Sequence, residues 1–196
     1  SGVAPAGRPG KPVADKTSGA MHLPVTGPEH AAMTEQRPPK GSEAPVTAAR
    51  IKAVCLSQRR DSPKSPVDRA RLRAGWGLVG DAHAGPRQAN RWQVSLLAWE
   101  RVQSVNQEHG LGAAPGNFAE NLSTVGVDTR RLRVGDRLRL GSQVLLEVEQ
   151  LGKPAAIAHT YNYRSHSLLP SDGVFCRIMI GGTVAPGDEI EVLAPG

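Results

Sequence analysis

The amino-acid sequence predicts a mainly β domain with one clear α-helix, preceded by a disordered segment. Three observations lead to this prediction. Short runs rich in Val, Leu and Ile recur in the second half of the chain, turn signals such as Gly-Ser separate them, and only one stretch has helical periodicity. Many short strands with a single helix favour a compact, strongly bent β-barrel over a parallel sheet with alternating helices.

The beginning of the chain differs from the rest in composition. Residues 1–50 contain 8 of the 16 prolines, no aromatic residue and only five Val, Leu or Ile residues. Such a segment cannot bury enough apolar surface to offset the entropy lost on ordering it. We therefore predict a disordered Pro/Gly-rich tail over residues 1–48 and one folded domain over residues 49–196.

The composition also limits the class of protein. The net charge of +6 permits an anionic partner, but two Tyr, two Phe and no basic cluster make a nucleic acid the least favoured one. No run approaches the roughly 18–20 apolar residues that span a bilayer. Two cysteines outside any Cys-x-x-Cys pattern, together with the lack of a secretory signal, favour a reducing compartment, and we expect a cytoplasmic protein. The expected partner, an anionic small molecule or cofactor, is suggested by the net charge.

The first half of the domain is predicted to contain two strands and a polar loop. Residues 51–57 are β-rich and indicate a strand, and residues 59–66 are polar with two prolines and indicate a loop. Residues 69–73 alternate Arg-Ala-Arg-Leu-Arg, which predicts a half-buried strand with arginines on its wet face. A glycine-punctuated loop containing Asp81 and His83 follows.

The one predicted helix covers residues 97–107. Apolar residues recur there at helical spacing, Ser95 is a candidate N-cap, and Gly110 is a candidate C-terminal stop. Residues 94–97 are compatible either with the end of a strand or with the start of this helix. A further short strand is expected at residues 121–124.

The second half of the domain is predicted to be β throughout. Its strands are expected at residues 137–140, 144–149, 174–180 and 189–193. Gly141-Ser142 between the first two indicates a hairpin turn. A Gly-Asp pair precedes both the first and the last of these strands, and such turns are common at the corners of small barrels.

Asp81 and His83 are the first candidate functional residues. On an extended backbone, residues two apart point the same way, so the carboxylate would orient the imidazole for acid–base chemistry. The alternative is a turn in which Asp81 caps backbone amides and His83 is solvated.

Glu120, Asn121 and Lys153 are the next candidates. A carboxyl and an amide side by side at the start of a strand offer the donors and acceptors that read the edge of a heterocycle. Lys153 follows the strongest predicted strand, where it can meet a phosphate. The alternatives are an ordinary strand cap and a solvated surface lysine. Cys55 and Cys176 both fall within predicted strands, and we expect them to be inert core residues.

Seven phrases, in order along the chain, resemble the MOSC domain, the module named for the C-terminal region of molybdenum cofactor sulfurases. The resemblance is closest to its small stand-alone bacterial members. The phrases are GLVGDAHAGP (77–86), QVSLLA (93–98), GNFAENL (116–122), VGDRLRLG (134–141), LEVEQLGK (146–153), GVFCRI (173–178) and GGTVAPGDEI (181–190).

The resemblance implies a strongly bent β-barrel that binds the molybdenum cofactor or a related anionic pterin. It implies sulfur-carrier or molybdenum-dependent reductase chemistry and a redox or sulfur-donor protein as partner. The resemblance is also compatible with a second anionic cofactor, pyridoxal phosphate. The candidate catalytic residues are His83 and Asp81, and the candidate cofactor-binding positions are Arg91, Glu120, Asn121, Lys153 and Ala155.

The sequence departs from the family pattern at two positions. Ala155 stands where the family has a cysteine, and an alanine can neither carry sulfur nor ligate molybdenum. Trp92 stands where the family has an arginine, although Arg91 is adjacent. These departures keep an alternative open, namely a thiol-independent enzyme or binding module for another small anion that uses His83 and Asp81.

Overall fold

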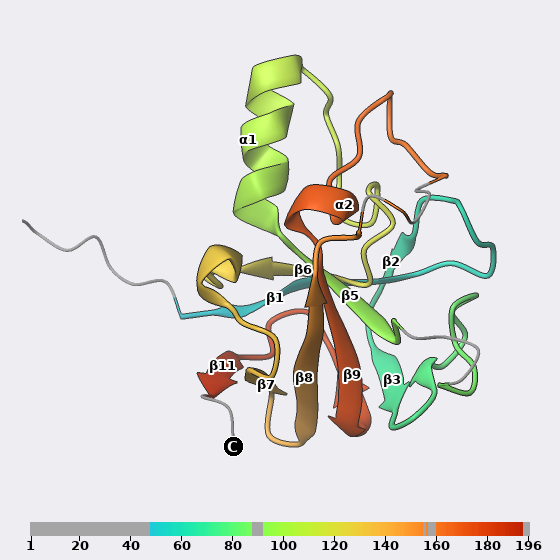
Figure 1. Ribbon diagram of the computed structural model, residues 1–196, viewed down its shortest axis with the longest axis vertical. Coiled ribbons are helices and arrows are strands. Elements are labelled where there is room, and N and C mark those ends of the chain that lie inside the picture. Colours follow the sequence, from blue (N-terminus) through green and yellow to red (C-terminus); the bar gives the residue numbers. More distant parts are fainter. Residues whose placement is uncertain (1–47, 88–91, 155, 157–159, 194–196) are drawn as a thin grey trace, which may run out of the picture. The chain divides into compact units, whose positions relative to one another are not determined.

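A computed structural model describes residues 48–87, 92–154, 156 and 160–193. Nearly all of the predicted disordered tail, residues 1–47, lies outside the described residues. The described chain is mainly β, with one clear helix and a short one (Figure 1). Its elements, in order, are β1 (Arg50–Leu56), β2 (Ser65–Val67), β3 (Ala70–Arg73), β4 (Gly77–Leu78), β5 (Val94–Ala98), α1 (Trp99–His109), β6 (Leu122–Val125), the 3-10 turn η1 (Thr129–Arg131), β7 (Arg137–Leu140), β8 (Val144–Leu151), α2 (Leu169–Asp172), β9 (Val174–Ile180), β10 (Gly182–Val184) and β11 (Ile190–Leu193).

The strands form an eight-stranded sheet in the order β11-β7-β8-β9-β5-β6-β1-β2 and a three-stranded sheet in the order β10-β3-β4. A barrel requires the ladder to return to its first strand. Here the start of β1 meets the segment leading into β11 at one isolated bridge, Arg50 with Glu189, and not along a ladder. Three backbone hydrogen bonds flank this bridge: Ile51 N–H to Asp188, Gly187 N–H to Ile51 and Ile190 N–H to Ala49. The predicted closed barrel is therefore not confirmed.

The predicted hairpin is confirmed. Strands β7 and β8 pair antiparallel, with Leu140 opposite Val144, and the turn between them begins at Gly141. Strand β8 then pairs along most of its length with β9, which lies beside it in Figure 1. Alternate residues of β8 are buried, as period-2 patterning requires for a sheet with one face on the core.

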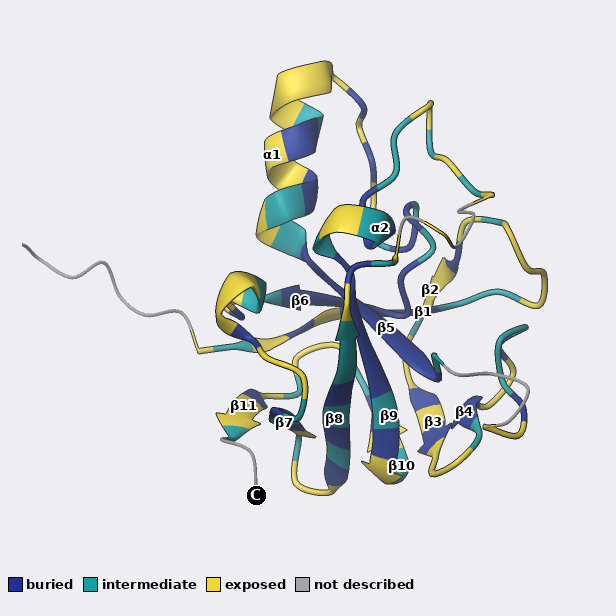
Figure 2. Cartoon of the chain, viewed as in Figure 1, coloured by how far each residue is buried: buried dark blue, intermediate teal, exposed yellow. Residues whose placement is uncertain are grey.

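Strand β5 is buried on both faces, which settles the ambiguity at residues 94–97 in favour of a strand. Val94 and Leu96 belong to the main hydrophobic core, whereas Leu97 belongs to a second cluster that Val102 of α1 and Phe118 complete. All five residues of β5 are buried, and the strand is dark blue throughout in Figure 2. Being central, it also pairs with both β6 and β9.

Helix α1 ends where the sequence predicts but begins two residues later. Gly110 adopts the left-handed conformation (φ 63°) and its N–H bonds to Asn106, which confirms the predicted stop. The predicted N-cap, Ser95, is wrong: Ala98 occupies the cap without a side-chain hydrogen bond, and Ser95 lies in β5. The pairing of β5 with two strands keeps its residues extended. No helix in the described ranges is long and apolar enough to cross a membrane.

The polar loop predicted at residues 59–66 is shorter than expected, because β2 begins at Ser65. Pro66 lies within β2, which is an edge strand that pairs only with β1. An edge strand tolerates proline, because the missing N–H is then not needed by a second neighbour.

The two Gly-Asp pairs form the same local structure. Gly135 and Gly187 both have φ of 96°, a conformation that favours glycine. Asp136 accepts a hydrogen bond from the N–H of residue 133, and Asp188 accepts one from the N–H of residue 185, at 2.7 and 2.9 Å. The shared phrase is therefore a turn that the aspartate side chain closes before the next strand.

The central position of β5 leads to a prediction about stability. Leu96 is 0 % exposed, so Leu96→Ala should lower the free energy of unfolding by about 2–5 kcal/mol in urea denaturation. Leu151→Ala is the matched control, because Leu151 is 43 % exposed and its truncation leaves no buried cavity. Equal losses in the two variants would contradict the assignment of β5 to the core.

Candidate functional site

The Asp81 carboxylate lies at the centre of the candidate site, in the turn that follows β4. Its Oδ2 accepts hydrogen bonds from Lys64 Nζ at 2.5 Å, the Ser57 N–H at 3.1 Å and Asn121 Nδ2 at 3.3 Å. Its Oδ1 accepts the His83 N–H at 2.9 Å and lies 3.2 Å from His83 Nδ1. We call Lys64, Asp81, His83 and Asn121 the Asp81 cluster.

The backbone at Asp81 and His83 is a turn and not the extended segment that would place both side chains on one face. The Asp81 N–H bonds to Leu78 at 3.1 Å, and the Ala84 N–H bonds to the Asp81 carbonyl at 2.9 Å. Asp81 accepts hydrogen bonds from the backbone amides of Ser57 and His83, which agrees with the turn that the sequence analysis gave as the alternative. The turn nevertheless brings the imidazole against the carboxylate, because the side chain of His83 folds back onto Oδ1.

Lys64 is a member of the candidate site that sequence reasoning missed. Its side chain and that of Asp81 are each 2 % exposed, so the two form a buried ion pair. Burial alone would raise the pKa of Asp81, but hydrogen bonds from His83 and the charge of Lys64 outweigh it and hold that pKa well below its ordinary range. In the sequence Lys64 stands in a polar run, 17 residues before its partner, and no local signal marks it.

The ring of His83 is the accessible member of the cluster. Its side chain is 40 % exposed, and Nδ1 is held between Asp81 at 3.2 Å and Lys64 Nζ at 3.5 Å. Within the described part of the chain, Nε2 makes no hydrogen bond. An imidazole that a carboxylate orients through one nitrogen presents the other for acid–base chemistry or for an anionic ligand.

Asn121 holds the cluster to the sheet. Its Oδ1 accepts hydrogen bonds from the N–H and Oγ of Ser95 in β5, at 3.2 and 3.1 Å. Its Nδ2 donates to the Cys55 carbonyl in β1 and to Asp81, both at 3.3 Å. The residue is buried and its amide is engaged on both sides, so the structure places Asn121 as the connection between two strands and the Asp81 turn.

Glu120 is fully buried next to this cluster. Its Oε1 accepts hydrogen bonds from the Gly116 N–H and Ser123 Oγ, both at 2.7 Å, whereas Oε2 is buried with no partner among the described residues. Burial raises the pKa of Glu120, and these hydrogen bonds oppose that rise only in part. The carboxyl group therefore keeps its proton to higher pH than an exposed glutamate.

The loop that carries Glu120 is fastened to Lys64 through Gly116. The Lys64 N–H bonds to the Gly116 carbonyl at 2.8 Å, and a Cβ at Gly116 would stand only 2.2 Å from the Lys64 carbonyl oxygen. The φ of 85° at Gly116 also favours glycine. One residue, Lys64, thus contacts the Asp81 turn with its side chain and the Glu120 loop with its backbone.

Lys153 lies at the end of β8, against two aromatic rings. Its Nζ is 5.3 Å from the ring centre of Trp92 and 5.8 Å from that of Phe175, and these rings lie 5.1 Å apart. Burial lowers the pKa of Lys153, and the negative charge of Asp61 opposes this effect. The preceding Gly152 cannot carry a side chain, because a Cβ would stand 2.5 Å from the Pro170 oxygen.

The loop after β1 lies beside both groups of residues. Arg60 Nε donates to the carbonyl of Ala82 at 3.3 Å, in the Asp81 turn. The neighbouring Asp61 acts electrostatically on Lys153 and accepts a hydrogen bond from Thr160. The structure therefore brings Asp81, His83 and Asn121 into contact, with Glu120 attached through Lys64 and with Lys153 next to the same loop.

Two predicted site positions, Arg91 and Ala155, lie outside the described residues. Both cysteines of the chain are described, and both are buried as expected. Burial, reinforced by the charge of Glu120, raises the pKa of Cys55 to about 12, and burial raises that of Cys176 even further. Neither thiol is available as a thiolate near neutral pH, so neither replaces the family cysteine.

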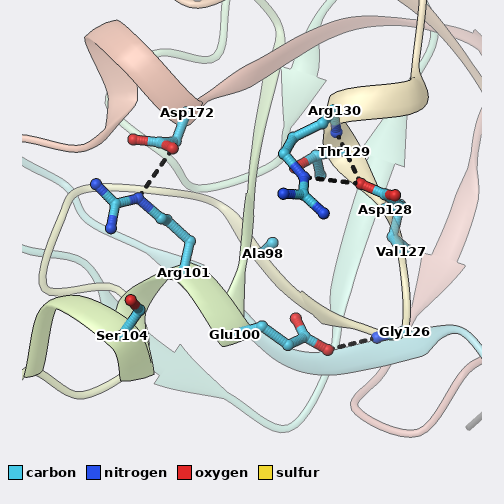
Figure 3. A pocket seen from close by; sticks show the side chains of 10 residues that line it. All are labelled: Ala98, Glu100, Arg101, Ser104, Gly126, Val127, Asp128, Thr129, Arg130 and Asp172. Carbon is cyan, nitrogen blue, oxygen red and sulfur yellow. Dashed lines mark hydrogen bonds and ion pairs between the residues drawn. The ribbon is translucent and has the colours of Figure 1, made fainter. Parts of the chain in front are cut away.

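A separate pocket of about 500 Å³ lies where β5 and β6 end and α1 begins (Figure 3). Figure 3 shows Arg101 with Asp172 on one wall and Arg130 with Asp128 on the other. These ion pairs have N–O distances of 3.0 and 3.3 Å, so each arginine is already neutralised by a carboxylate. None of the predicted site residues that the structure describes lines this pocket.

The Asp81 cluster leads to a prediction about buried charge. Asp81→Asn leaves the Lys64 ammonium buried without its carboxylate, and we expect a loss of about 3–5 kcal/mol in the free energy of unfolding at pH 7. Adding Lys64→Met to this variant should restore part of the loss, because it removes the unpaired charge. Urea denaturation of the two single variants and the double variant measures this coupling.

The control for the buried pair is the exposed pair Arg139–Glu191, whose side chains are 49 % and 58 % exposed. Arg139→Gln should change the free energy of unfolding by only about 0–1 kcal/mol. Two results together would contradict the role that we assign to the buried pair. Each single variant, Lys64→Met and Asp81→Asn, would lose no more free energy of unfolding than this control, and the double variant would lose the sum of the two.

Glu120 leads to a prediction about pH dependence. Because its folded pKa is raised, its contribution to stability is fully present below the unfolded pKa of about 4.3 and is lost as pH rises through the folded pKa. From about pH 4.5 upward, wild-type stability should therefore fall relative to Glu120→Gln, by at most about 1.4 kcal/mol per pH unit. Urea denaturation between pH 4.5 and about 8 tests this, with Glu191→Gln as an exposed control; parallel profiles for wild type and Glu120→Gln would contradict it.

Comparison with known proteins identifies the family of this domain. The model of the MOSC domain family matches residues 80–191, which include the predicted site residues from Asp81 to Lys153. A search of the curated proteins finds no match.

Solved structures share the fold at low sequence identity. The YUAD protein from Bacillus subtilis is 21 % identical with a TM-score of 0.60, and the match covers 76 % of this chain and 98 % of that one. YiiM from Geobacillus stearothermophilus is 17 % identical with a TM-score of 0.53, covering 74 % of this chain and 75 % of that one. YiiM from Escherichia coli is 22 % identical with a TM-score of 0.53, covering 75 % and 71 %. With a family model that spans more than half of the sequence and neighbours that share its fold, the chain belongs to the MOSC domain family.

Proposed function

We propose that this MOSC domain binds the molybdenum cofactor, or a related anionic pterin, without a protein thiol. The family is associated with this cofactor. The observation that carries the proposal for this chain is the half-buried ammonium group of Lys153, held against Trp92 and Phe175. A cation that is partly removed from water attracts a phosphate more strongly than a solvated one does, because the local dielectric constant is lower.

The other groups of the site suit a pterin. The Oε2 of Glu120 is buried and has no partner among the described residues, so it reaches a ring heteroatom only where the Glu120 loop opens. Its raised pKa allows the carboxyl group to donate a hydrogen bond as well as to accept one. Asn121 acts as a positioning residue, because its amide fixes Asp81 and β1 against β5.

The thiol chemistry of the family does not fit this chain. A soft thiolate is the protein ligand that suits molybdenum or accepts a persulfide. Cys55 and Cys176 are both buried with raised pKa values, and Ala155 stands at the family cysteine position. We therefore derive no sulfur-transfer step. The cofactor would supply redox chemistry when bound, and the residues of this chain would bind it and orient it, with the raised pKa of Glu120 favouring a proton there.

A second candidate function is favoured by His83. The contact of its Nδ1 with Asp81 and the exposure of its ring are those of a general acid–base that acts on a small anionic substrate. Under this candidate, the protein is a thiol-independent enzyme or binding module on the same fold. It would carry no pterin, and its activity would depend on His83.

The experiment that separates these candidates is native mass spectrometry with metal analysis of the full chain, purified from a host that makes the molybdenum cofactor. We expect a pterin adduct with molybdenum on the unmodified chain, and about tenfold lower occupancy in Lys153→Gln. Lys52→Gln is a matched control, because Lys52 Nζ also lies over a tryptophan, 5.0 Å from the ring centre of Trp99. Its occupancy should equal that of the unmodified chain.

The variant Ala155→Cys tests the requirement for a thiol. An adduct that forms only on this variant would show that binding without a thiol is wrong. A clean apo mass for both proteins would reject the cofactor altogether and leave the second candidate, which then predicts that His83→Gln abolishes binding of its anionic substrate.

A further inference from the structure

A second pocket, of about 440 Å³, lies over the paired strands β3 and β10. It is at the other end of β8 from Lys153, since Gln143 of its lining immediately precedes β8 and Lys153 follows it. The polar side chains that line it are those of Arg71, Arg73, Gln143 and Thr183. It is therefore distinct from the proposed cofactor site.

The strand geometry places the two arginines together. Arg71 and Arg73 are exposed and alternate with Leu72, which is only 1 % exposed, so both guanidinium groups stand on the outer face of β3. Their Cα atoms are about 6.5–7 Å apart by the rise of a strand. Thr183 of β10 is the register partner of Arg71, which brings its side chain to the same face.

The charge of this pocket is not neutralised. Among the described residues, neither Arg71 nor Arg73 forms an ion pair, whereas Arg137, Arg139 and Arg177 each lie within ion-pair distance of a glutamate. The described residues that line the pocket include no acidic one. The pocket in Figure 3 is different, because its two arginines are paired with aspartates.

One of the two guanidinium groups is also held in place. The Arg73 guanidinium carbon lies 4.9 Å from the ring centre of Trp76. Stacking on a ring face restricts the side chain but leaves the N–H groups at the edge of the guanidinium plane able to donate. The threonine hydroxyl and the glutamine amide add further donors, so the polar lining is dominated by groups that donate to an anion.

We propose that this pocket binds a phosphate or pyrophosphate group of a small molecule. Two guanidinium forks match the oxygens of a multiply charged phosphate in a bidentate manner, which a singly charged carboxylate cannot exploit to the same extent. The spacing of the two arginines allows them to converge on one phosphate or to contact the two phosphates of a pyrophosphate. The site does not depend on the proposed cofactor function.

The test is isothermal titration calorimetry of the full chain with inorganic pyrophosphate and with inorganic phosphate. We expect one site, with pyrophosphate bound more tightly. The double variant Arg71→Gln/Arg73→Gln should lower the pyrophosphate affinity by about 100-fold, because removing each guanidinium group should weaken binding by about tenfold. Thr183→Val should lower it by a smaller factor, about threefold.

The matched control is Arg131→Gln/Arg133→Gln, which removes two exposed arginines near η1 and changes the net charge equally. Its pyrophosphate affinity should stay within about twofold of the unmodified chain. Circular dichroism of all variants checks that they fold. Equal losses in the two double variants would overturn the proposal, because they would show attraction to net charge only.

Two further outcomes would also overturn the proposal. One is the absence of pyrophosphate binding at concentrations up to about 10 mM. The other is tighter binding of a single-stranded oligonucleotide than of pyrophosphate. If that binding is lost in Arg71→Gln/Arg73→Gln and its affinity falls steeply with salt, the ligand of this pocket is a nucleic acid and not a small molecule.

Discussion

The buried ion pair between Lys64 and Asp81 is the interaction on which the rest of the candidate site depends. Two charges whose side chains are 2 % exposed need each other and further hydrogen bonds to offset the loss of their hydration. Asp81 meets this condition through contacts from His83, Ser57 and Asn121 in addition to Lys64. The pair thereby joins the loop after β1 to the turn after β4.

Lys64 also fixes the position of a second loop, the one that carries Glu120. Because its backbone packs against Gly116 too closely for any side chain there, the Glu120 loop cannot move independently of the Asp81 turn. A buried glutamate whose pKa is raised and a buried aspartate whose pKa is lowered thus lie next to each other in one packed region. Burial acts on both carboxyl groups, but hydrogen bonds from His83 and the charge of Lys64 outweigh it at Asp81, whereas Glu120 has only neutral donors.

Fold and chemistry are separable in this domain. The fold depends on the core residues of β5, β8 and β9 and on Gly116 and Gly152, where no side chain fits. None of these requirements involves a cysteine at position 155. The groups that would contact a ligand come from loops, where substitution has little effect on the core. A MOSC domain that lacks the family thiol is therefore physically reasonable, and its cations, at Lys153 and at the β3–β10 pocket, favour anionic ligands at two separate places.

The sequence alone determined the local structure. The hairpin at Gly141, the stop of α1 at Gly110 and the period-2 strands follow from backbone conformation and side-chain alternation within a few residues, and the structure confirms them. The residue types and spacing of Asp81, His83 and Asn121, and then the resemblance to a family, singled them out as candidates, and the structure brings them into contact.

Only the tertiary structure decided which of these groups touch and what surrounds them. It made residues 94–97 a strand, since β5 is buried by neighbours from distant parts of the chain. It left the sheet open, because the described part of β1 meets the segment before β11 at a single bridge. It made Lys64 the partner of Asp81. The physical reason is that a buried charge is defined by contacts across many residues of sequence, whereas a lysine in a polar run is indistinguishable, in sequence, from a solvated one.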